Sequence, residues 1–171
     1  MKLPKIIYLF PLMLLLPLVS LKFPLDTAFA KEPVILEYPP EIDESASGSA
    51  KIRFEMAGSS KPLTPYFLKL AFYKDPLGCS ATSSGRKNYF GKTWVGDKWV
   101  GNSENYSLQL PLMTDENRVW EGTVGYMADS ADGGYSGAGD YCLLAGRYTE
   151  KGGGPEWSEV AQIKISASES P

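Results

Sequence analysis

Six short runs of this sequence alternate apolar and polar residues, and this alternation constrains the fold more than any other feature. The runs cover residues 52–56, 68–72, 108–110, 120–126, 141–145 and 161–165. A period of two is typical of strands that bury one face and expose the other. Clusters rich in Gly, Pro, Ser and Asp, which favour turns, separate several of the runs, at 58–62, 75–78, 129–139 and 151–155. The pattern predicts an all-β protein, an antiparallel sandwich or barrel.

A tight hairpin is expected within the long segment between the second and fourth runs. Gly96-Asp97 stands between Thr93-Trp94-Val95 and Lys98-Trp99-Val100. A two-residue turn with Gly first is typical of a type II′ hairpin.

The first thirty residues have the layout of a secretory signal peptide. Two lysines precede an almost wholly apolar run at 6–21, and Ala28-Phe29-Ala30 supplies the small-residue pattern of a cleavage site. The alternative is an uncleaved anchor, but the apolar run is shorter than the roughly 20 residues of a spanning helix and contains Pro11 and Pro17. We expect cleavage after Ala30 and a single domain over residues 31–171, with its core at about 34–166, that is secreted or held at the cell surface without membrane insertion.

Composition excludes several kinds of function. The chain has no histidine and two cysteines, which excludes His-based triads, His-ligated metals and four-cysteine clusters. Cleavage after Ala30 leaves 14 basic and 19 acidic residues, so the chain lacks the basic surplus of nucleic-acid-binding proteins. The acidic clusters 41–44 and 115–116 are sequence neighbours, whereas a glycosidase needs two carboxyl groups facing each other across a cleft. We therefore expect no enzymatic activity and no nucleic-acid partner.

The C-terminal third resembles the last hairpin of a fibronectin type III domain, an immunoglobulin-like sandwich. The resemblance rests on 141–148, with Tyr141 opening strand F, and on Gly152, Gly154, Pro155 and the Trp157-Ser158 pair. It implies strand B at 51–56, strand C at 66–74 and a long C-to-E excursion that contains the extra hairpin. Phe54 stands in strand B where that family usually has tryptophan. Independently of the family, a tyrosine after a Gly-Asp turn is expected to bury its ring and bond its hydroxyl to nearby backbone, as in a tyrosine corner.

A second resemblance, to an uncharacterised module of secreted bacterial surface proteins sometimes found beside lamin-tail domains, rests on several aromatic and glycine motifs. They are 88–91, Trp94-Val95, Trp99-Val100, 139–141 and 146–148. It implies a cell-surface location and no known activity.

The fibronectin-like topology implies a disulfide between Cys79 and Cys142. Strands C and F are antiparallel neighbours in that fold, so the end of C lies near the start of F, and an oxidising compartment favours the bond. The alternative is two unpaired thiols. Because Cys142 alternates out of phase with Tyr141 and Leu143, we expect it to face away from the core.

The glycine-rich segment 129–140 raises the possibility of a calcium site. Asp129, Asp132 and Asp140 could supply oxygen ligands, with carbonyls and water completing the shell. The spacing does not match an EF-hand, and the alternative is an ordinary loop with exposed aspartates. No other cofactor is expected.

Aromatic residues are the remaining binding signal. Tyr89, Trp94, Trp99 and Tyr135 lie in or just after the long excursion, and exposed rings on a sandwich can stack on sugars. The alternative is that they pack on one another as core or cross-strand pairs. We therefore expect a non-catalytic binding or adhesion module for an extracellular protein or glycan, with a carbohydrate-binding module that uses the aromatics of 89–106 as the alternative function.

Overall fold

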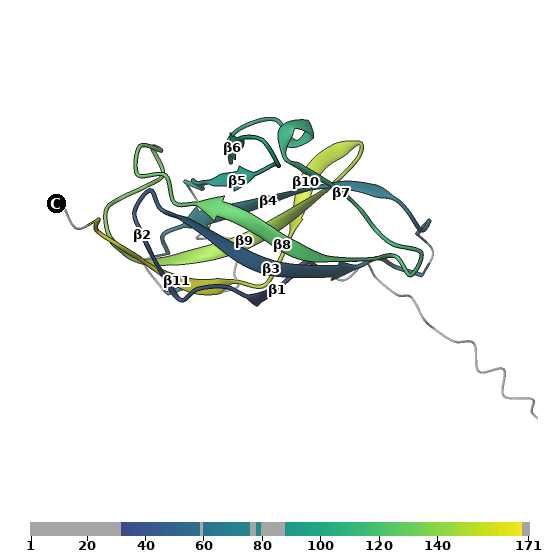
Figure 1. The fold of residues 1–171 in the computed structure, drawn as a ribbon, viewed down its shortest axis with the longest axis horizontal. Coiled ribbons are helices and arrows are strands. Elements are labelled where there is room, and N and C mark those ends of the chain that lie inside the picture. The colour runs from purple at the N-terminus through teal and green to yellow at the C-terminus, as the bar shows by residue number, and fades with distance from the viewer. Residues whose placement is uncertain (1–31, 59, 76–77, 80–87, 169–171) are drawn as a thin grey trace, which may run out of the picture.

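The computed structural model describes residues 32–58, 60–75, 78–79 and 88–168. The predicted signal peptide, residues 1–30, lies outside these described residues. Within them the chain forms strands and one short 3-10 helix, η2 (Tyr106–Leu108), and the strands make two sheets that pack face to face (Figure 1). The expected all-β sandwich is confirmed.

The first sheet has five strands in the order β1-β3-β8-β5-β6. Its strands are β1 (Val34–Glu37), β3 (Ser47–Glu55), β8 (Val119–Met127), β5 (Lys92–Trp94) and β6 (Trp99–Gly101). β3 and β8 pair along their whole length, from Ser47 with Met127 to Glu55 with Val119. The predicted hairpin is confirmed as β5–β6, in which Trp94 pairs with Trp99.

The second sheet has the order β2-β11-β9-β4-β7, and β10 also pairs with β9. Its strands are β2 (Glu41–Asp43), β11 (Ala161–Ser166), β9 (Gly139–Thr149), β4 (Pro65–Tyr73), β7 (Leu110–Met113) and β10 (Gly152–Trp157). The expectation of wholly antiparallel sheets is wrong at one pair, because β2 runs parallel to β11. The chain leaves the first sheet after β1 and passes through Pro39-Pro40 to join the edge of the second sheet as β2.

The main core lies between the two sheets and takes the alternate residues that the sequence pattern predicted. Phe54, Leu68 and Tyr126 are among its most deeply buried members. The run at 108–110 differs from expectation: Leu108 is 45% exposed and lies in η2, and the inward positions are Leu110 and Leu112. The cause is local, because the Asn105 side chain accepts a hydrogen bond from the Ser107 amide and closes the turn before the strand begins.

Segment 88–94 closes the gap between the two sheets along one side. Phe90 exchanges backbone hydrogen bonds with Phe72 of β4, both at 3.0 Å. Three residues later the Thr93 hydroxyl accepts a bond from the Leu70 amide at 2.9 Å, while β5 pairs with β8 in the other sheet. This part of the long excursion therefore connects the sheets.

The predicted turn at 151–155 differs from what is observed. Gly152–Trp157 forms strand β10, which pairs with β9 through a register shift between Gly152 and Glu156. Gly152 and Gly153 have φ values of 77° and 96°, a conformation that glycine adopts without steric cost. β10 and β11 thus lie one after the other along the same edge of β9.

Candidate functional site

The predicted tyrosine corner is confirmed at Tyr141. Its ring is fully buried, and its hydroxyl donates to the Gly137 carbonyl at 2.6 Å. The Ser136 amide donates back to that hydroxyl at 3.2 Å. These bonds fix the glycine-rich loop to the start of β9.

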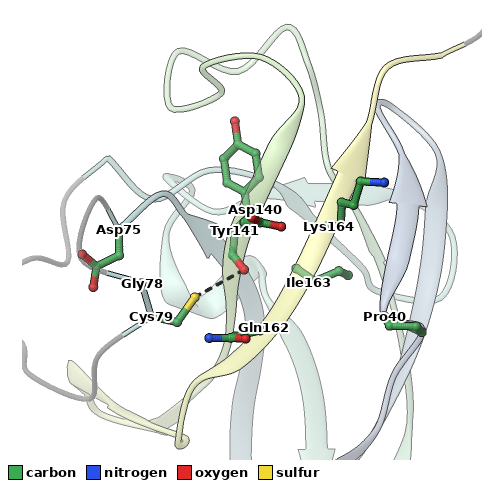
Figure 2. Close-up of a pocket in the computed structure, with 9 residues that line it drawn as sticks. All are labelled: Pro40, Asp75, Gly78, Cys79, Asp140, Tyr141, Gln162, Ile163 and Lys164. Carbon is green, nitrogen blue, oxygen red and sulfur yellow. Dashed lines mark hydrogen bonds between the residues drawn. The ribbon is translucent and has the colours of Figure 1, made fainter.

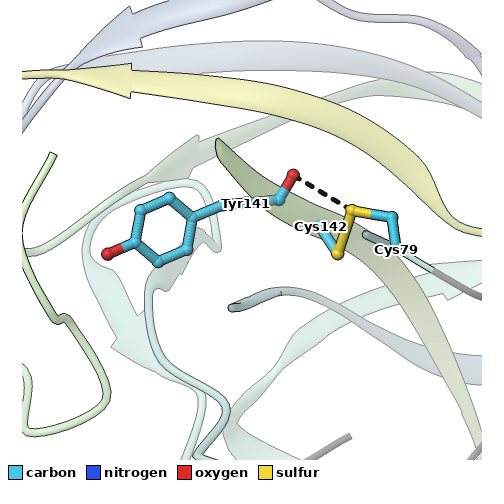
Figure 3. Close-up of a disulfide and its surroundings, with 3 residues drawn as sticks. All are labelled: Cys79, Tyr141 and Cys142. Carbon is cyan, nitrogen blue, oxygen red and sulfur yellow. Dashed lines mark hydrogen bonds between the residues drawn. A yellow bond between two sulfur atoms is a disulfide. The ribbon is translucent and has the colours of Figure 1, made fainter. Parts of the chain in front are cut away.

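The predicted disulfide joins Cys79 to Cys142, and their Cα atoms are 5.4 Å apart (Figure 3). It links the chain just beyond β4 to β9, which are neighbouring strands. Cys142 faces away from the inter-sheet core as expected, yet it is fully buried, in a second cluster with Tyr73 and Leu144. Tyr89 and Trp157 pack against this cluster.

A surface hollow of about 360 Å³ lies beside the disulfide (Figure 2). Asp75, Asp140, Gln162 and Lys164 contribute polar groups to its wall. Lys164 is already bonded to Glu41, Nζ to Oε1 at 2.8 Å. Asp140, one of the three predicted calcium ligands, therefore lies in this hollow.

The other two predicted calcium ligands have protein partners. Asp129 forms an ion pair with Lys92 at 2.6 Å, which lowers the pKa of the carboxyl, and it also accepts from the Ala131 amide. Asp132 accepts from the Gly134 amide at 3.1 Å. In the described part of the chain no three Cys, Asp or Glu side chains are grouped as a metal site would require. Calcium binding stays a prediction.

Tyr135 lies at one end of the core. Its ring stacks on Tyr141 with centroids 6.0 Å apart, and its edge meets Phe90. The hydroxyl donates to Glu44 at 2.6 Å; partial burial and this bond raise the pKa of Tyr135 to about 12. The structure therefore gives Tyr135 a packing role at this end of the sandwich.

The outer face of the six-stranded sheet is covered by a row of aromatic side chains from the chain itself. We call this set the aromatic row: Phe67, Tyr89, Tyr106, Tyr148 and Trp157. Its members stack in pairs, Tyr89 on Trp157 at 5.0 Å and Tyr106 on Tyr148 at 5.8 Å between centroids. Each ring of these two pairs therefore has one face occupied by another ring of the row.

Lys69 lies beneath the aromatic row and is only 8% exposed. Its Nζ is 5.3 Å from the Tyr148 ring centroid and 5.2 Å from that of Trp157, and it donates to the Asn102 carbonyl at 3.3 Å. Burial lowers the pKa of Lys69 to about 8. Cation–π contacts with two rings stabilise this buried ammonium group.

The outer face of the five-stranded sheet is different, and we call it the open face. Trp94 is 37% exposed and is the most exposed aromatic side chain of the described residues. It meets Trp99 edge-to-face, with centroids 5.2 Å apart. The predicted alternative, that these two tryptophans pack on each other across the hairpin, is confirmed for the pair, and Trp94 nevertheless keeps an exposed surface.

The centre of the open face consists of small and polar side chains on β3 and β8. Ser49 pairs with Gly125, and Lys51 pairs with Thr123 at the next outward position. A Cβ atom added at Gly125 would lie 3.0 Å from Trp94 Cβ. A side chain at position 125 would therefore be crowded by Trp94, which packs closely against β8 at this point.

Charged groups on the open face neutralise one another. Glu121 bonds both Lys51 at 3.0 Å and Arg53 at 3.2 Å, and these bonds lower the pKa of its carboxyl. Lys51 also lies near Glu37. Glu121 and Glu37 both raise the pKa of Lys51, and the hydrogen bond from Lys51 to Glu121 is the largest cause. The face presents hydrogen-bonding groups without a surplus of either charge.

One hollow lies on the open face and a second lies at its end, where β3 and β8 approach β7 of the other sheet. The first, of about 340 Å³, is lined by Glu37, Tyr38, Pro39, Ser49, Lys51 and Thr123. The second, of about 420 Å³, is lined by Arg53, Met113, Asp115, Val119, Trp120 and Glu121.

The sequence did not single out Ser49, Lys51 and Thr123 as candidate site residues. Its alternation pattern contained the signal for two of them, because Lys51 precedes inward Ile52 and Thr123 precedes inward Val124. Of the four predicted binding aromatics, only Trp94 and Trp99 lie together on the open face. Tyr89 belongs to the aromatic row and Tyr135 to the end of the core.

No family model and no curated protein matches this chain. Among solved structures it is similar to AvmM, which catalyses macrocyclization in alchivemycin A biosynthesis, at 12% identity over 81% of this chain and 89% of that one, with a TM-score of 0.35. It is also similar to a cohesin module of a Clostridium perfringens family 33 glycoside hydrolase, at 13% identity over 81% of this chain and 98% of that one, with a TM-score of 0.32. At these scores neither neighbour bears on the fold or function of this chain.

Proposed function

We propose that this chain is a non-catalytic binding module of immunoglobulin-like, fibronectin type III character that acts outside the cytoplasm. The strand order supports this class: β1-β3-β8 form one sheet, and β4, β9 and β11 are neighbours in the other, as strands A-B-E and C-F-G are in immunoglobulin-like sandwiches. The parallel β2–β11 pair and the β5–β6 hairpin are additions to that basic arrangement.

An extracellular or cell-surface location is supported by two features. The first is the predicted signal peptide. The second is the Cys79–Cys142 disulfide, because such bonds persist mainly in oxidising compartments. In the described part of the chain no helix is long and apolar enough to cross a bilayer.

The open face is the surface that we assign to partner binding. The observation that carries this assignment is the contrast between the two outer faces: the aromatic row covers one, whereas the other exposes Trp94 beside hydroxyl-bearing side chains. Tryptophan is enriched among the residues that contribute most of the binding energy at interfaces. Extracellular protein or glycan is the partner class, and the acidic balance of residues 31–171 disfavours nucleic acid.

The contacts of the acidic clusters 41–44 and 115–116 support a non-catalytic role. Glu41 bonds Lys164 and Ser166, and Glu44 accepts from Tyr135. Asp115 accepts from the backbone amides of Asn117 and Val119, as in a turn. These groups stabilise chain crossings and turns.

A steric block tests the proposal. Thr123 is exposed at the centre of the open face. A protein of residues 31–171 that carries Thr123→Arg should therefore bind to secreted and cell-surface material of the source organism at least about tenfold more weakly than the wild type. Gln162→Arg is the matched control, because Gln162 is an exposed strand residue on β11 of the other sheet, and it should leave retention unchanged. Equal retention of Thr123→Arg and the wild type would overturn the assignment.

A further inference from the structure

The open face offers one exposed aromatic ring with a rigid mounting. Trp94 is supported from the side by Trp99 and from below by Gly125. A ring held in this way loses little conformational freedom when a ligand stacks on it. The apolar faces of sugar rings stack on such indole surfaces.

Hydroxyl groups follow the ring along the strands. Ser49 is the cross-strand partner of Gly125, where Trp94 crosses. The next outward pair, Lys51 with Thr123, lies about 7 Å further along because strands rise by roughly 3.3 Å per residue. Both Ser49 and Thr123 also line the 340 Å³ hollow.

That hollow contains donors and acceptors together. Lys51 supplies donors, Glu37 supplies acceptors, and the hydroxyls of Ser49 and Thr123 do both. Sugar hydroxyls also donate and accept, so they match a mixed wall of this kind. A long apolar side chain would leave these groups without partners.

The charged and aliphatic residues of the open face further restrict the class of ligand that it can bind. Three cations, Lys51, Arg53 and Lys92, are balanced by three carboxylates, Glu37, Glu121 and Asp129, so no surplus charge is present to select a sulfated or acidic ligand. The exposed aliphatic residues Val34 and Leu36 lie on β1, with β3 and β8 between them and Trp94. The centre of the face therefore lacks the apolar cluster of a protein interface.

We infer that the open face binds a neutral glycan, with one sugar ring stacked on Trp94 and the next sugar residue bonded to Thr123, Ser49 and the adjoining hollow. This inference rests on the proposed function, since it names the ligand class of the same face. The glycan runs along β3 and β8 from Trp94 toward Lys51.

Calorimetric titration with defined oligosaccharides tests the ligand class. The probes are cellohexaose, xylohexaose and mannohexaose, whose sugar units all carry vicinal diols, with polygalacturonate and heparin as anionic comparisons. At least one neutral probe should bind, and Trp94→Ala should weaken that binding by about tenfold or more. Thr123→Val, which keeps the side-chain shape and removes the hydroxyl, should weaken it by about threefold to tenfold.

Tyr89→Ala is the control variant, because it removes an aromatic ring from the aromatic row on the opposite face. It should bind the neutral probe as the wild type does. Binding of the anionic probes alone, no binding to any probe, or equal binding by Trp94→Ala would each overturn the inference. Circular dichroism of every variant confirms that folding is intact.

Treatment of the retained native material separates this inference from the proposed function. Periodate, which cleaves vicinal diols of sugars, should abolish retention, and protease should not. Retention that is lost to protease, resists periodate and is still blocked by Thr123→Arg would refute the glycan while leaving the open face as a protein-binding surface. Retention that Thr123→Arg does not affect would refute the proposed function itself.

Discussion

Replacing both Cys79 and Cys142 with alanine should lower the free energy of unfolding by about 4 kcal/mol. The bridge joins residues 63 positions apart, and closing a loop of that size lowers the entropy of the unfolded chain by an amount equivalent to about 4 kcal/mol at 25 °C. Cys142 is also fully buried beneath Tyr89 and Trp157, so the variant loses packing as well. For a domain of this length the loss corresponds to a fall of roughly 10–15 °C in Tm.

Urea unfolding of residues 31–171 measures the effect in three samples: oxidised wild type, wild type with reductant, and the double alanine variant. The last two should have similar midpoints, well below that of the first. Reductant should not change the variant. A loss smaller than about 1 kcal/mol, or a variant that still responds to reductant, would refute the reasoning.

Three further predictions concern the aromatic row and the tyrosine corner. Burial lowers the pKa of Lys69 from 10.5 to about 8. Between pH 8 and pH 10.5, Lys69 is therefore protonated in the unfolded chain and has released that proton in the folded chain. The free energy of unfolding, measured with urea, should rise from pH 8 toward pH 10 for this reason. Lys69→Met should remove this rise, and an identical pH slope in both proteins would contradict it. Tyr141→Phe leaves the Gly137 carbonyl without its 2.6 Å donor and should lower the free energy of thermal unfolding by about 1–2 kcal/mol. Tyr106→Phe removes an exposed hydroxyl that bonds at 3.4 Å and should lower it far less. Equal losses in the two variants would contradict a stabilising tyrosine corner. Gly146→Ala places a Cβ 2.7 Å from Trp157 Cζ3, so it should destabilise the fold by about 1–3 kcal/mol and change the near-ultraviolet circular dichroism spectrum. Gly133→Ala, whose added Cβ meets nothing within 4 Å, should change neither stability nor spectrum. Equal effects of the two variants would contradict close packing of Trp157 on β9.

The alternation of apolar residues predicted the main strands because one face of each is buried. Phe54, Leu70 and Leu143 all point into the inter-sheet core as expected. The strand prediction was wrong at Leu108, because the Asn105 side chain caps a turn of 3-10 helix there. The pairing of β10 with β9 was missed because glycines at 152–154 signal a turn and are equally compatible with a bulged edge strand.

Burial of charged residues could not be predicted from the pattern. Alternation alone would point Lys69 away from the core and Arg147 toward it, yet both are nearly fully buried. Their stabilising partners come from distant parts of the chain: Tyr148 and Trp157 for Lys69, Phe54 and Tyr66 for Arg147. Such contacts depend on which strands become neighbours.

The candidate site was only half predictable for the same reason. Trp94 and Trp99 are brought together by a local turn, which the sequence reveals. Tyr89 is separated from them because segment 88–94 crosses from one sheet to the other between Tyr89 and Trp94. The contribution of Thr123 and Ser49 depends on the register of β3 with β8, which alternation does not determine across strands.

Hydroxyl-radical footprinting tests the central claim, that the open face is the binding surface, most directly. A protein of residues 31–171 is oxidised alone and in the presence of the extracellular material it retains, and modification of each aromatic residue is measured by mass spectrometry. We predict that Trp94 becomes protected while Trp157 and Tyr106 of the aromatic row are modified as before. Protection of Trp157 and Tyr106 with Trp94 unchanged would contradict the account.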